Sequence, residues 1–338
     1  MMPIPSRTAL LRLTSTIPRR TLHQRPPATS YPTTTTTTTT AAPARAMASQ
    51  QKPEGGAHAQ HNPHPDFKSV EASRPPFDAS LGVRFTKTVD PDWKLGGGAN
   101  ALGRSDAAHV AVDPYEDGRP AIFNYKLLIS SVVPRPIAFL STRSADGSVE
   151  NLAPFSYFNM VNHDPPLFVV GFSASVARPK DSLRCLLESR ECVINIIGEG
   201  FVEAANSTSV NAPYGRSEWE VSGLTPVRDC KHVAAPRVKE AVFSVEGKLD
   251  FYKEYDSKST PGKKSGVVAF IEGVNFWVRE DAINADKNLV DPKVLRPISR
   301  LGGITYGRTT EVLELPRLDW DKDVGGDEGW EKTVKSKQ

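Results

Sequence analysis

The order of apolar and polar residues through the middle of the chain is typical of β-strands. Apolar or alternating runs of strand length are separated by turn residues. The Asp146-Gly147 pair between the first two runs is a hairpin turn signal. We therefore expect strands at residues 136–143, 149–161, 167–172, 191–197, 241–250, 266–278 and 304–310.

Two segments depart from this pattern and predict short helices. Leu183, Leu186 and Leu187 recur at near-helical spacing. Pro179 and Asp181 stand near the start of this run, where proline and acidic residues favour a helix N-terminus. A second short helix is expected at residues 200–207. Many strands with a few short helices indicate a mainly β fold, a closed or partly closed antiparallel barrel, over residues 122–318.

The N-terminal segment differs in composition from this body. Seven basic residues precede the first acid, Glu54, and removing them leaves 35 basic against 39 acidic residues, a net charge of −4. A segment rich in Arg, Ser and Thr and free of acids is typical of a mitochondrial transit peptide. We predict one at residues 1–46 and a location in the mitochondrial matrix. Two alternatives stay open: a disordered basic tail, or translation from Met47 and a cytoplasmic protein.

Three further segments flank the body. We expect a disordered low-complexity linker at residues 47–65, because too little apolar area is available there to offset the entropy of ordering. Residues 66–121 are rich in Gly, Pro and Asp but contain Phe67, Phe77, Phe85 and Trp93, which predicts an extended arm that packs on the body. Residues 319–338 are predicted to form a charged C-terminal tail.

Composition narrows the function classes. No apolar run approaches the roughly 18 residues of a membrane span, and the mildly acidic body argues against nucleic-acid binding. Cys185, Cys192 and Cys230 have no CxxC spacing, so we expect reduced thiols and no metal site. Residues 198–203 resemble a dinucleotide fingerprint, but Glu203 stands at its third glycine and would repel a pyrophosphate.

A cluster of polar residues around the first predicted helix could bind a phosphate. Arg178 and Lys180 supply positive charge. The N–H groups at the start of a helix near Asp181, together with the Ser182 hydroxyl, make a natural anion site. Asp181 opposes a phosphate unless its side chain turns away to cap the helix.

The segment before this cluster carries polar residues where a plain strand would have Val or Ile. Asn151, Ser156 and Asn159 offer neutral hydrogen-bonding groups, and Pro154 interrupts regular pairing. Aromatic faces come from Phe155, Tyr157 and Phe158. A phosphate site, neutral polar groups and an apolar wall are what flavin mononucleotide (FMN) requires. From chemistry alone, a bulged edge strand followed by an ordinary helix cap explains the same residues, and this alternative stays open.

Five sequence elements follow one another in the order PRPIAFLST, NLAPFSYFN, DPP, KDS and RLGG. Together they resemble the flavin reductase-like family of FMN-binding split-barrel proteins over roughly residues 122–318. The resemblance implies a six-stranded split β-barrel with Greek-key topology, a homodimer, and FMN bound at the dimer interface. The arm before residue 122 has no counterpart in the small bacterial members.

The resemblance also implies positions for cofactor-binding residues. The phosphate would be held by Lys180, Asp181 and Ser182, with Arg178 as a further contact. Many members have Thr where this chain has Ser182, a difference that keeps the hydroxyl. The ribityl chain and the ring would be lined by Thr142, Asn151, Ala153, Pro154, Ser156 and Phe158, to which the polar pattern adds Asn159.

The implied activity is that of an oxidoreductase of the flavin reductase type. NADH or NADPH can pass a hydride to flavin when the two rings stack, so no general base is needed and we name no catalytic residue. The electrons would go to free flavin for a partner oxygenase or to a small acceptor. The alternative is an FMN-binding electron carrier or flavin-handling protein without turnover. A weaker alternative is heme binding, although neither His163 nor His232 stands in a motif for an axial ligand.

Overall fold

The computed structural model describes His64 and residues 66–103 and 107–336. The chain separates into two units, Met1–Ala57 and His58–Gln338, and every described residue belongs to the second. The predicted transit peptide at residues 1–46 therefore lies outside the described residues. So does the predicted linker at residues 47–65, apart from His64.

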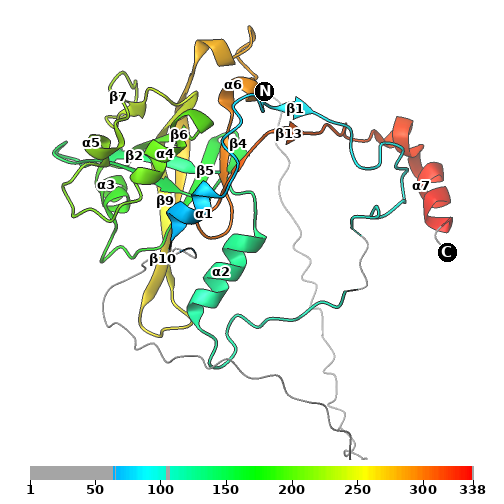
Figure 1. Cartoon of the computed structure of the whole chain (residues 1–338), viewed down its shortest axis with the longest axis horizontal. Helices are drawn as coiled ribbons and strands as arrows, with labels where there is room; N and C mark the ends of the chain where they lie inside the picture. The colour runs from blue at the N-terminus through cyan, green and yellow to red at the C-terminus, as the bar shows by residue number, and fades with distance from the viewer. Residues whose placement is uncertain (1–63, 65, 104–106, 337–338) are drawn as a thin grey trace, which may run out of the picture. The chain divides into compact units, whose positions relative to one another are not determined.

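Seven strands form one antiparallel sheet, which confirms the prediction of a mainly β fold. Their order across the sheet is β3-β2-β6-β9-β10-β5-β4 (Figure 1). The strands are β2 (Ala138–Arg143), β3 (Glu150–Phe155), β4 (Phe158–His163), β5 (Pro166–Phe172), β6 (Glu191–Ile196), β9 (Phe243–Asp256) and β10 (Lys264–Val278). The β2–β3 and β4–β5 pairs thus lie at opposite edges of this order, with β6, β9 and β10 between them.

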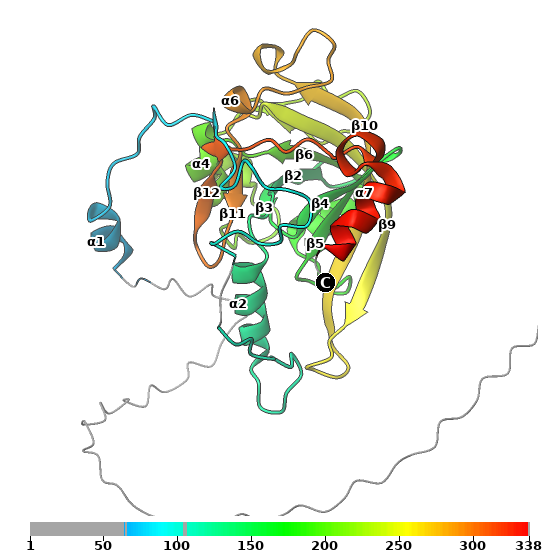
Figure 2. The ribbon, with the colours of Figure 1, turned by 90° about the vertical axis from the view of Figure 1, so that its right-hand side faces the viewer.

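The two edges of this sheet are close neighbours in the sequence. β3 ends at Phe155 and β4 begins at Phe158, so only Ser156 and Tyr157 separate the two edge strands. Gly171 in β5 donates a backbone hydrogen bond to the Tyr157 carbonyl at 2.7 Å. The sheet must therefore curl until its edges approach each other (Figure 2). Counting β3 and β4 as one bent strand gives the six strands expected of a split barrel.

The hairpin between β2 and β3 fixes the register at which polar residues face each other. Thr142 lies opposite Asn151. At the turn, the Asp146 carboxylate accepts a hydrogen bond from the Ser144 hydroxyl at 2.6 Å, and this bond and others lower the pKa of Asp146 to about 2. Gly147 has a φ of 75°, a left-handed conformation that glycine adopts without strain. The predicted turn is confirmed.

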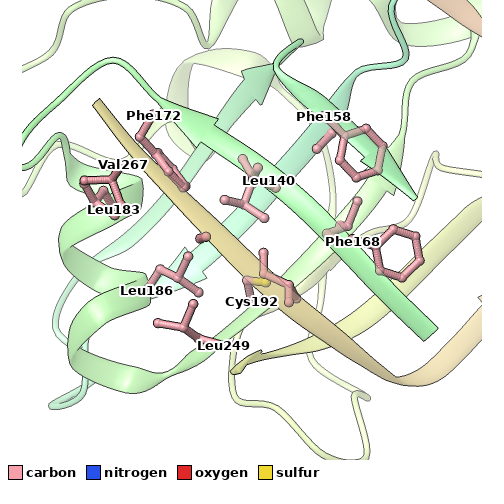
Figure 3. Close-up of a cluster of buried hydrophobic side chains, with 14 of the residues drawn as sticks. Leu140, Phe158, Phe168, Phe172, Leu183, Leu186, Cys192, Leu249 and Val267 are labelled. Atoms are coloured by element: carbon pink, nitrogen blue, oxygen red, sulfur yellow. The ribbon is translucent and has the colours of Figure 1, made fainter. Parts of the chain in front are cut away.

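The predicted helix after β5 is α3 (Asp181–Ser189), and the barrel core holds it in place. Leu183 and Leu186 are fully buried in one cluster with Leu140 of β2 and Phe172 of β5 (Figure 3). Burying a leucine contributes about 1.5–3 kcal/mol. The start of α3 is thereby fixed beside β2 and β3, where the polar residues of interest lie.

A second apolar cluster lies on the other face of β2. Phe139 belongs to it, whereas its neighbour Leu140 belongs to the first cluster, because successive strand residues point to opposite faces. Phe201 of η1 (Glu199–Phe201) and Trp219 of α5 (Glu218–Ser222) pack in this second cluster. The helix predicted at residues 200–207 is realised as η1 followed by α4 (Val202–Ser207).

The remaining elements are short and lie mostly towards the ends of the chain. They are α1 (Phe67–Ala72), β1 (Arg84–Phe85), α2 (Ala121–Ser131), β7 (Pro226–Val227), β8 (Arg237–Val238), η2 (Glu280–Ala282), α6 (Pro292–Leu295), β11 (Ile298–Arg300), β12 (Tyr306–Arg308), β13 (Glu311–Val312), η3 (Trp320–Val324) and α7 (Gly326–Lys335). The strand predicted at residues 304–310 is therefore shortened to β12. Among the described residues, no helix has both the length and the apolar character needed to cross a membrane.

The arm at residues 66–121 is tied to the C-terminal part of the chain. β1 pairs in parallel with β13. The Arg308 guanidinium donates hydrogen bonds to the carbonyls of Asp78 at 3.2 Å and Leu81 at 2.9 Å. Elsewhere the arm leaves large apolar side chains exposed, such as Phe77 and Trp93.

Candidate functional site

The strand and the helix that were predicted to bind a cofactor meet in the structure. The Ser182 hydroxyl, in the first turn of α3, donates a hydrogen bond to Asn151 Oδ1 on β3. Asn151 and Ser182 are only 3% and 2% exposed. Two predicted residues that are 31 positions apart in the sequence therefore form one buried contact.

A third member of this cluster, Glu218, was not predicted from the sequence. Its Oε2 accepts hydrogen bonds from Asn151 Nδ2 at 2.7 Å and from the Leu152 N–H at 3.2 Å. Burial raises the pKa of Glu218, and the negative charge of Asp181 adds to this, against the lowering effect of the hydrogen bonds. The bonds from Glu218 through Asn151 to Ser182 fix the orientation of the Asn151 amide.

Local sequence could not have linked Glu218 to this site, because 67 residues separate it from Asn151. The one local signal is Ser217, which stands where a serine usually caps a helix. Its hydroxyl instead donates to the Glu150 carbonyl at 2.6 Å. That bond ties the start of α5 to β3 and holds Glu218 behind Asn151.

Thr142 adds a buried hydroxyl next to this cluster. It lies opposite Asn151 in the β2–β3 register, and opposite residues share one face of a sheet. Its side chain is fully buried, and its Oγ1 has no hydrogen-bond partner of normal geometry among the described residues. The atom is closed off from the surface and interacts with the Cys185 thiol, since a side-chain hydrogen bond with Thr142 acts to lower the pKa of that thiol. Nearby Cys185 is a neutral thiol, since burial raises its pKa to about 11.

The start of α3 offers donors to an anion. Lys180 precedes the helix with extended backbone and an exposed side chain, and its side chain forms no cap. The first N–H groups of a helix have no partner within it, and the helix dipole adds partial positive charge. The Asp181 carboxylate does not form the cap considered for it: burial raises its pKa, the Arg184 charge lowers it, and no hydrogen bond contributes.

Two further residues predicted to contact the phosphate lie at this end of α3. Ser182 gives its single hydroxyl proton to Asn151 in this structure, so Lys180 and the backbone N–H groups are the donors left for an anion. Arg178 is exposed, and its backbone N–H donates to the Ser175 carbonyl at 3.2 Å. Contact of the Ser182 or the Arg178 side chain with a phosphate stays a prediction.

The residues predicted for the ring side lie where β3 bends into β4. Ala153, Pro154 and Ser156 are partly buried, and Asn159 is exposed. Phe158 instead points into the core and stacks on Phe168, with ring centroids 6.1 Å apart and planes at 10° (Figure 3). The structure thus gives Phe158 a packing role that the sequence did not indicate.

Two hollows on the described surface lie away from these residues. One, of about 450 Å³, is lined by the β2–β3 turn and the end of α3. The other, of about 430 Å³, lies between Phe67 of α1 and residues 302–306. None of the eleven predicted cofactor residues lines either hollow.

Sequence comparison identifies relatives of this chain. The family model described as "Flavin reductase like domain" matches residues 130–292, a range that contains all eleven predicted cofactor residues. The uncharacterized protein YwrF of Bacillus subtilis is 35% identical over 193 residues, which cover 57% of this chain and 92% of that protein. The matched family range leaves out the arm at residues 66–121 and the C-terminal tail.

Structure comparison gives similar proteins of known fold. Nitrilotriacetate monooxygenase component B from Bacillus cereus is 34% identical, with a TM-score of 0.57, covering 62% of this chain and all of that one. The 2-nitrobenzoate 2-nitroreductase of Pseudomonas fluorescens is 31% identical, with a TM-score of 0.52, covering 63% and 98%. A flavin reductase with a split barrel domain from Shewanella frigidimarina has a TM-score of 0.51 at 20% identity, covers 60% and 95%, and supports the split-barrel fold alone.

The predicted mitochondrial location is wrong. Sequence relatives of this chain include proteins of Bacillus subtilis and other bacteria, which have no mitochondria. The prediction rested on the composition of residues 1–46 and on the alternation of apolar and basic residues in TALLRLTSTIPRR. A scarcity of acids and an excess of Arg and Ser can arise in a segment without any targeting role, so composition was too weak a guide.

Proposed function

Because this chain belongs to the flavin reductase-like family, we propose that it is an FMN-dependent oxidoreductase that takes electrons from NADH or NADPH. The observation that carries the proposal is the meeting of Asn151 with the start of α3, next to the buried hydroxyl of Thr142. Neutral polar groups and an anion site lie within one small area there. This combination matches the ribityl chain and phosphate of FMN.

The phosphate end of the site is built from charge and backbone. Lys180 and Arg178 are exposed and positive, and the first N–H groups of α3 point towards the same end of the helix. Charge-assisted hydrogen bonds to a phosphate are about twice as strong as neutral ones. Lys180 would therefore contribute most of the attraction, and Asp181 would oppose it unless it is protonated or turned away.

The ribityl and ring side is built from the bend of β3. Thr142 and Asn151 would bind the ribityl hydroxyls, and Glu218 would hold the Asn151 amide in place for that contact. Ala153, Pro154 and Ser156 would lie along the ring. Bound FMN would supply the hydride acceptor that amino-acid side chains lack. The residues of this chain bind and orient, and none is needed as a general base.

We further propose that two copies form a dimer across the bend of β3 and β4. Tyr157, Met160 and Val161 are 43%, 60% and 50% exposed on this edge. Exposed apolar groups that cluster on one edge mark an interaction surface. A second copy placed there would cover the open side of the flavin site, which supports binding of FMN between the two copies.

The electron acceptor that we propose is free flavin, which would carry electrons to a partner oxygenase. The name of the Bacillus cereus protein, component B of a monooxygenase, supports this two-component arrangement. Direct reduction of a small acceptor is the second candidate, and the name of the Pseudomonas fluorescens nitroreductase supports it. Heme binding has less support, because His163 and His232 are both exposed on the surface.

One experiment tests the proposal. The absorption spectrum of the purified full chain is recorded before and after NADH or NADPH is added without oxygen. Flavin peaks that bleach within seconds are expected for a reductase. Flavin peaks that persist with both donors identify a carrier and overturn the proposed turnover. A chain that takes up no flavin after incubation with FMN overturns the cofactor assignment, and a Soret band would replace it with heme.

A further inference from the structure

Residues 311–336, which include the described part of the predicted C-terminal tail and are called the tail below, carry apolar side chains that stay exposed. Trp320 of η3 and Trp330 of α7 pack on each other, with ring centroids 5.8 Å apart. The apolar side chains that are between 45% and 74% exposed are Leu313, Leu315, Leu318, Trp320, Trp330 and Val334. The tail therefore presents an apolar surface that the other described residues leave about half exposed.

The tail is also acidic. Residues 311–336 contain eight acidic and four basic residues, a net charge of −4. Its exit from the barrel is fixed, because β13 pairs with β1 and because Arg84 forms an ion pair of 2.6 Å with Glu311.

The tip of the β9–β10 hairpin, residues 251–264, has the opposite charge. It contains four lysines against Glu254 and Asp256, a net charge of +2. Phe251, Tyr252 and Tyr255 are 49%, 40% and 46% exposed on it. The hairpin tip is thus a second apolar surface, and its charge complements that of the tail.

We propose that the tail of one copy of this chain binds the hairpin tip of a second copy. Opposite charges steer and align such a contact. Six apolar side chains, each about half exposed, offer roughly 600 Å² if each contributes about 100 Å². One partner of a standard stable interface buries about 800 Å². In a two-fold dimer the contact occurs twice, because each copy presents both surfaces, so the total area is ample.

The contact is independent of flavin, so it goes beyond the proposed function. It also differs from the proposed dimer edge at β4, because neither the tail nor the hairpin tip includes residues of that strand. The tail lies outside residues 130–292, which the family model matches. We therefore expect it to strengthen association in this chain beyond what the barrel alone provides.

The first test measures self-association of the full chain by sedimentation over a range of concentrations. Leu315→Ser is the test variant, because Leu315 is 74% exposed and its replacement leaves the folded monomer intact. Val221→Ser is the matched control, since Val221 is 64% exposed on α5. We expect at least a fivefold rise in the dissociation constant for the first variant and no change for the second. Equal dissociation constants, or a chain that stays monomeric, overturn the proposal.

The second test locates the contact. Copies labelled with ¹⁵N are mixed with unlabelled copies, and a carbodiimide joins lysines to nearby carboxylates. We expect mixed-isotope links between Lys258 or Lys263 of the tip and acidic residues of the tail. Links that are found only within one copy overturn the proposal. Flavin reduction measured on Leu315→Ser keeps the two questions separate, because this variant is expected to reduce flavin normally whether or not it associates.

Discussion

Replacing Glu218 with Ala tests whether this buried carboxylate supports the candidate site. Glu218 is 5% exposed and is the acceptor for the Asn151 amide and the Leu152 N–H. The replacement leaves both donors buried without a partner. We expect the free energy of unfolding to fall and FMN to bind more weakly, because the Asn151 amide loses the group that orients it.

The size of the effect follows from the contacts. Each buried donor left unpaired costs about 1–3 kcal/mol, which gives roughly 2–6 kcal/mol for two. The replacement also removes the cost of burying a carboxylate, which the raised pKa of Glu218 indicates. This gain offsets part of the loss in stability. We therefore expect a net loss of about 2–3 kcal/mol. Glu218→Gln keeps the shape and one acceptor oxygen, so its loss should stay below about 1 kcal/mol.

Urea unfolding measures the stability, and fluorescence titration measures FMN affinity. Glu220→Ala is the matched control, because Glu220 lies on the same helix but is exposed. We expect FMN affinity to fall at least fivefold for Glu218→Ala alone. If Glu218→Ala matches Glu220→Ala within about 0.5 kcal/mol, the usual range for surface changes, the reasoning about Glu218 is refuted.

The pH dependence of this group has a definite sign. Burial places the folded pKa of Glu218 above its ordinary value of 4.5, so the folded state binds the proton more tightly than the unfolded state. The stability of the native chain relative to Glu218→Gln should therefore rise as pH falls from above the folded pKa to 4.5. A difference that falls over this range contradicts the assigned environment.

Three further predictions concern charged residues. Lys180→Glu should weaken FMN binding at least tenfold, because it reverses a charge at the phosphate end. Lys239→Glu, a charge reversal at an exposed position elsewhere, should leave FMN binding unchanged. If both variants bind FMN with the native affinity, Lys180 is not part of the site. Burial raises the pKa of Glu199, but hydrogen bonds from its two arginine partners outweigh this and lower it below 4.5. The stabilisation by Glu199 is therefore present above pH 4.5 and lost as pH falls through the folded pKa. In Glu199→Gln, the free energy of unfolding measured with urea should fall less steeply as the pH is lowered below 4.5. The same steepness as in the native chain would contradict this. Glu246→Leu should cost more than about 3 kcal/mol, because the fully buried carboxylate accepts from two backbone N–H groups, an amide and an indole; thermal unfolding within a degree of the native chain would refute that role.

The sequence predicted most of the barrel and placed the helix beside it. Helix α3 spans Asp181–Ser189, as the leucine spacing indicated, and the Asp146 turn lies where the hairpin was expected. Besides the shortened strand at residues 304–310, two strands were less well predicted. The run at 149–161 breaks at Ser156 and Tyr157 into β3 and β4, and β9 extends to Asp256 rather than residue 250. Residues 251–256 are mostly exposed and do not alternate apolar with polar side chains, so no strand pattern marks the extension.

The sequence predicted which residues belong to the candidate site better than it predicted which of them contact each other. The sequence selected Asn151 and Ser182 separately, as a ribityl contact and a phosphate contact. In the structure they bind each other and Glu218. Phe158 was selected for an aromatic face and lies in the core. Residue type indicates what a side chain can do, whereas its direction depends on neighbours that are distant in the sequence.

By itself the sequence determined the local elements, because turns, caps and apolar spacing act over a few residues and leave a readable pattern. Tertiary structure alone decided which groups share one buried space. Glu218 reaches Asn151 only because the barrel brings α5 against β3, across 67 residues. The exposure of the tail was decided in the same way, since an apolar residue has no fixed burial until the rest of the chain has packed. A hydrogen bond or a buried contact needs a partner, and these partners come together only when the barrel forms.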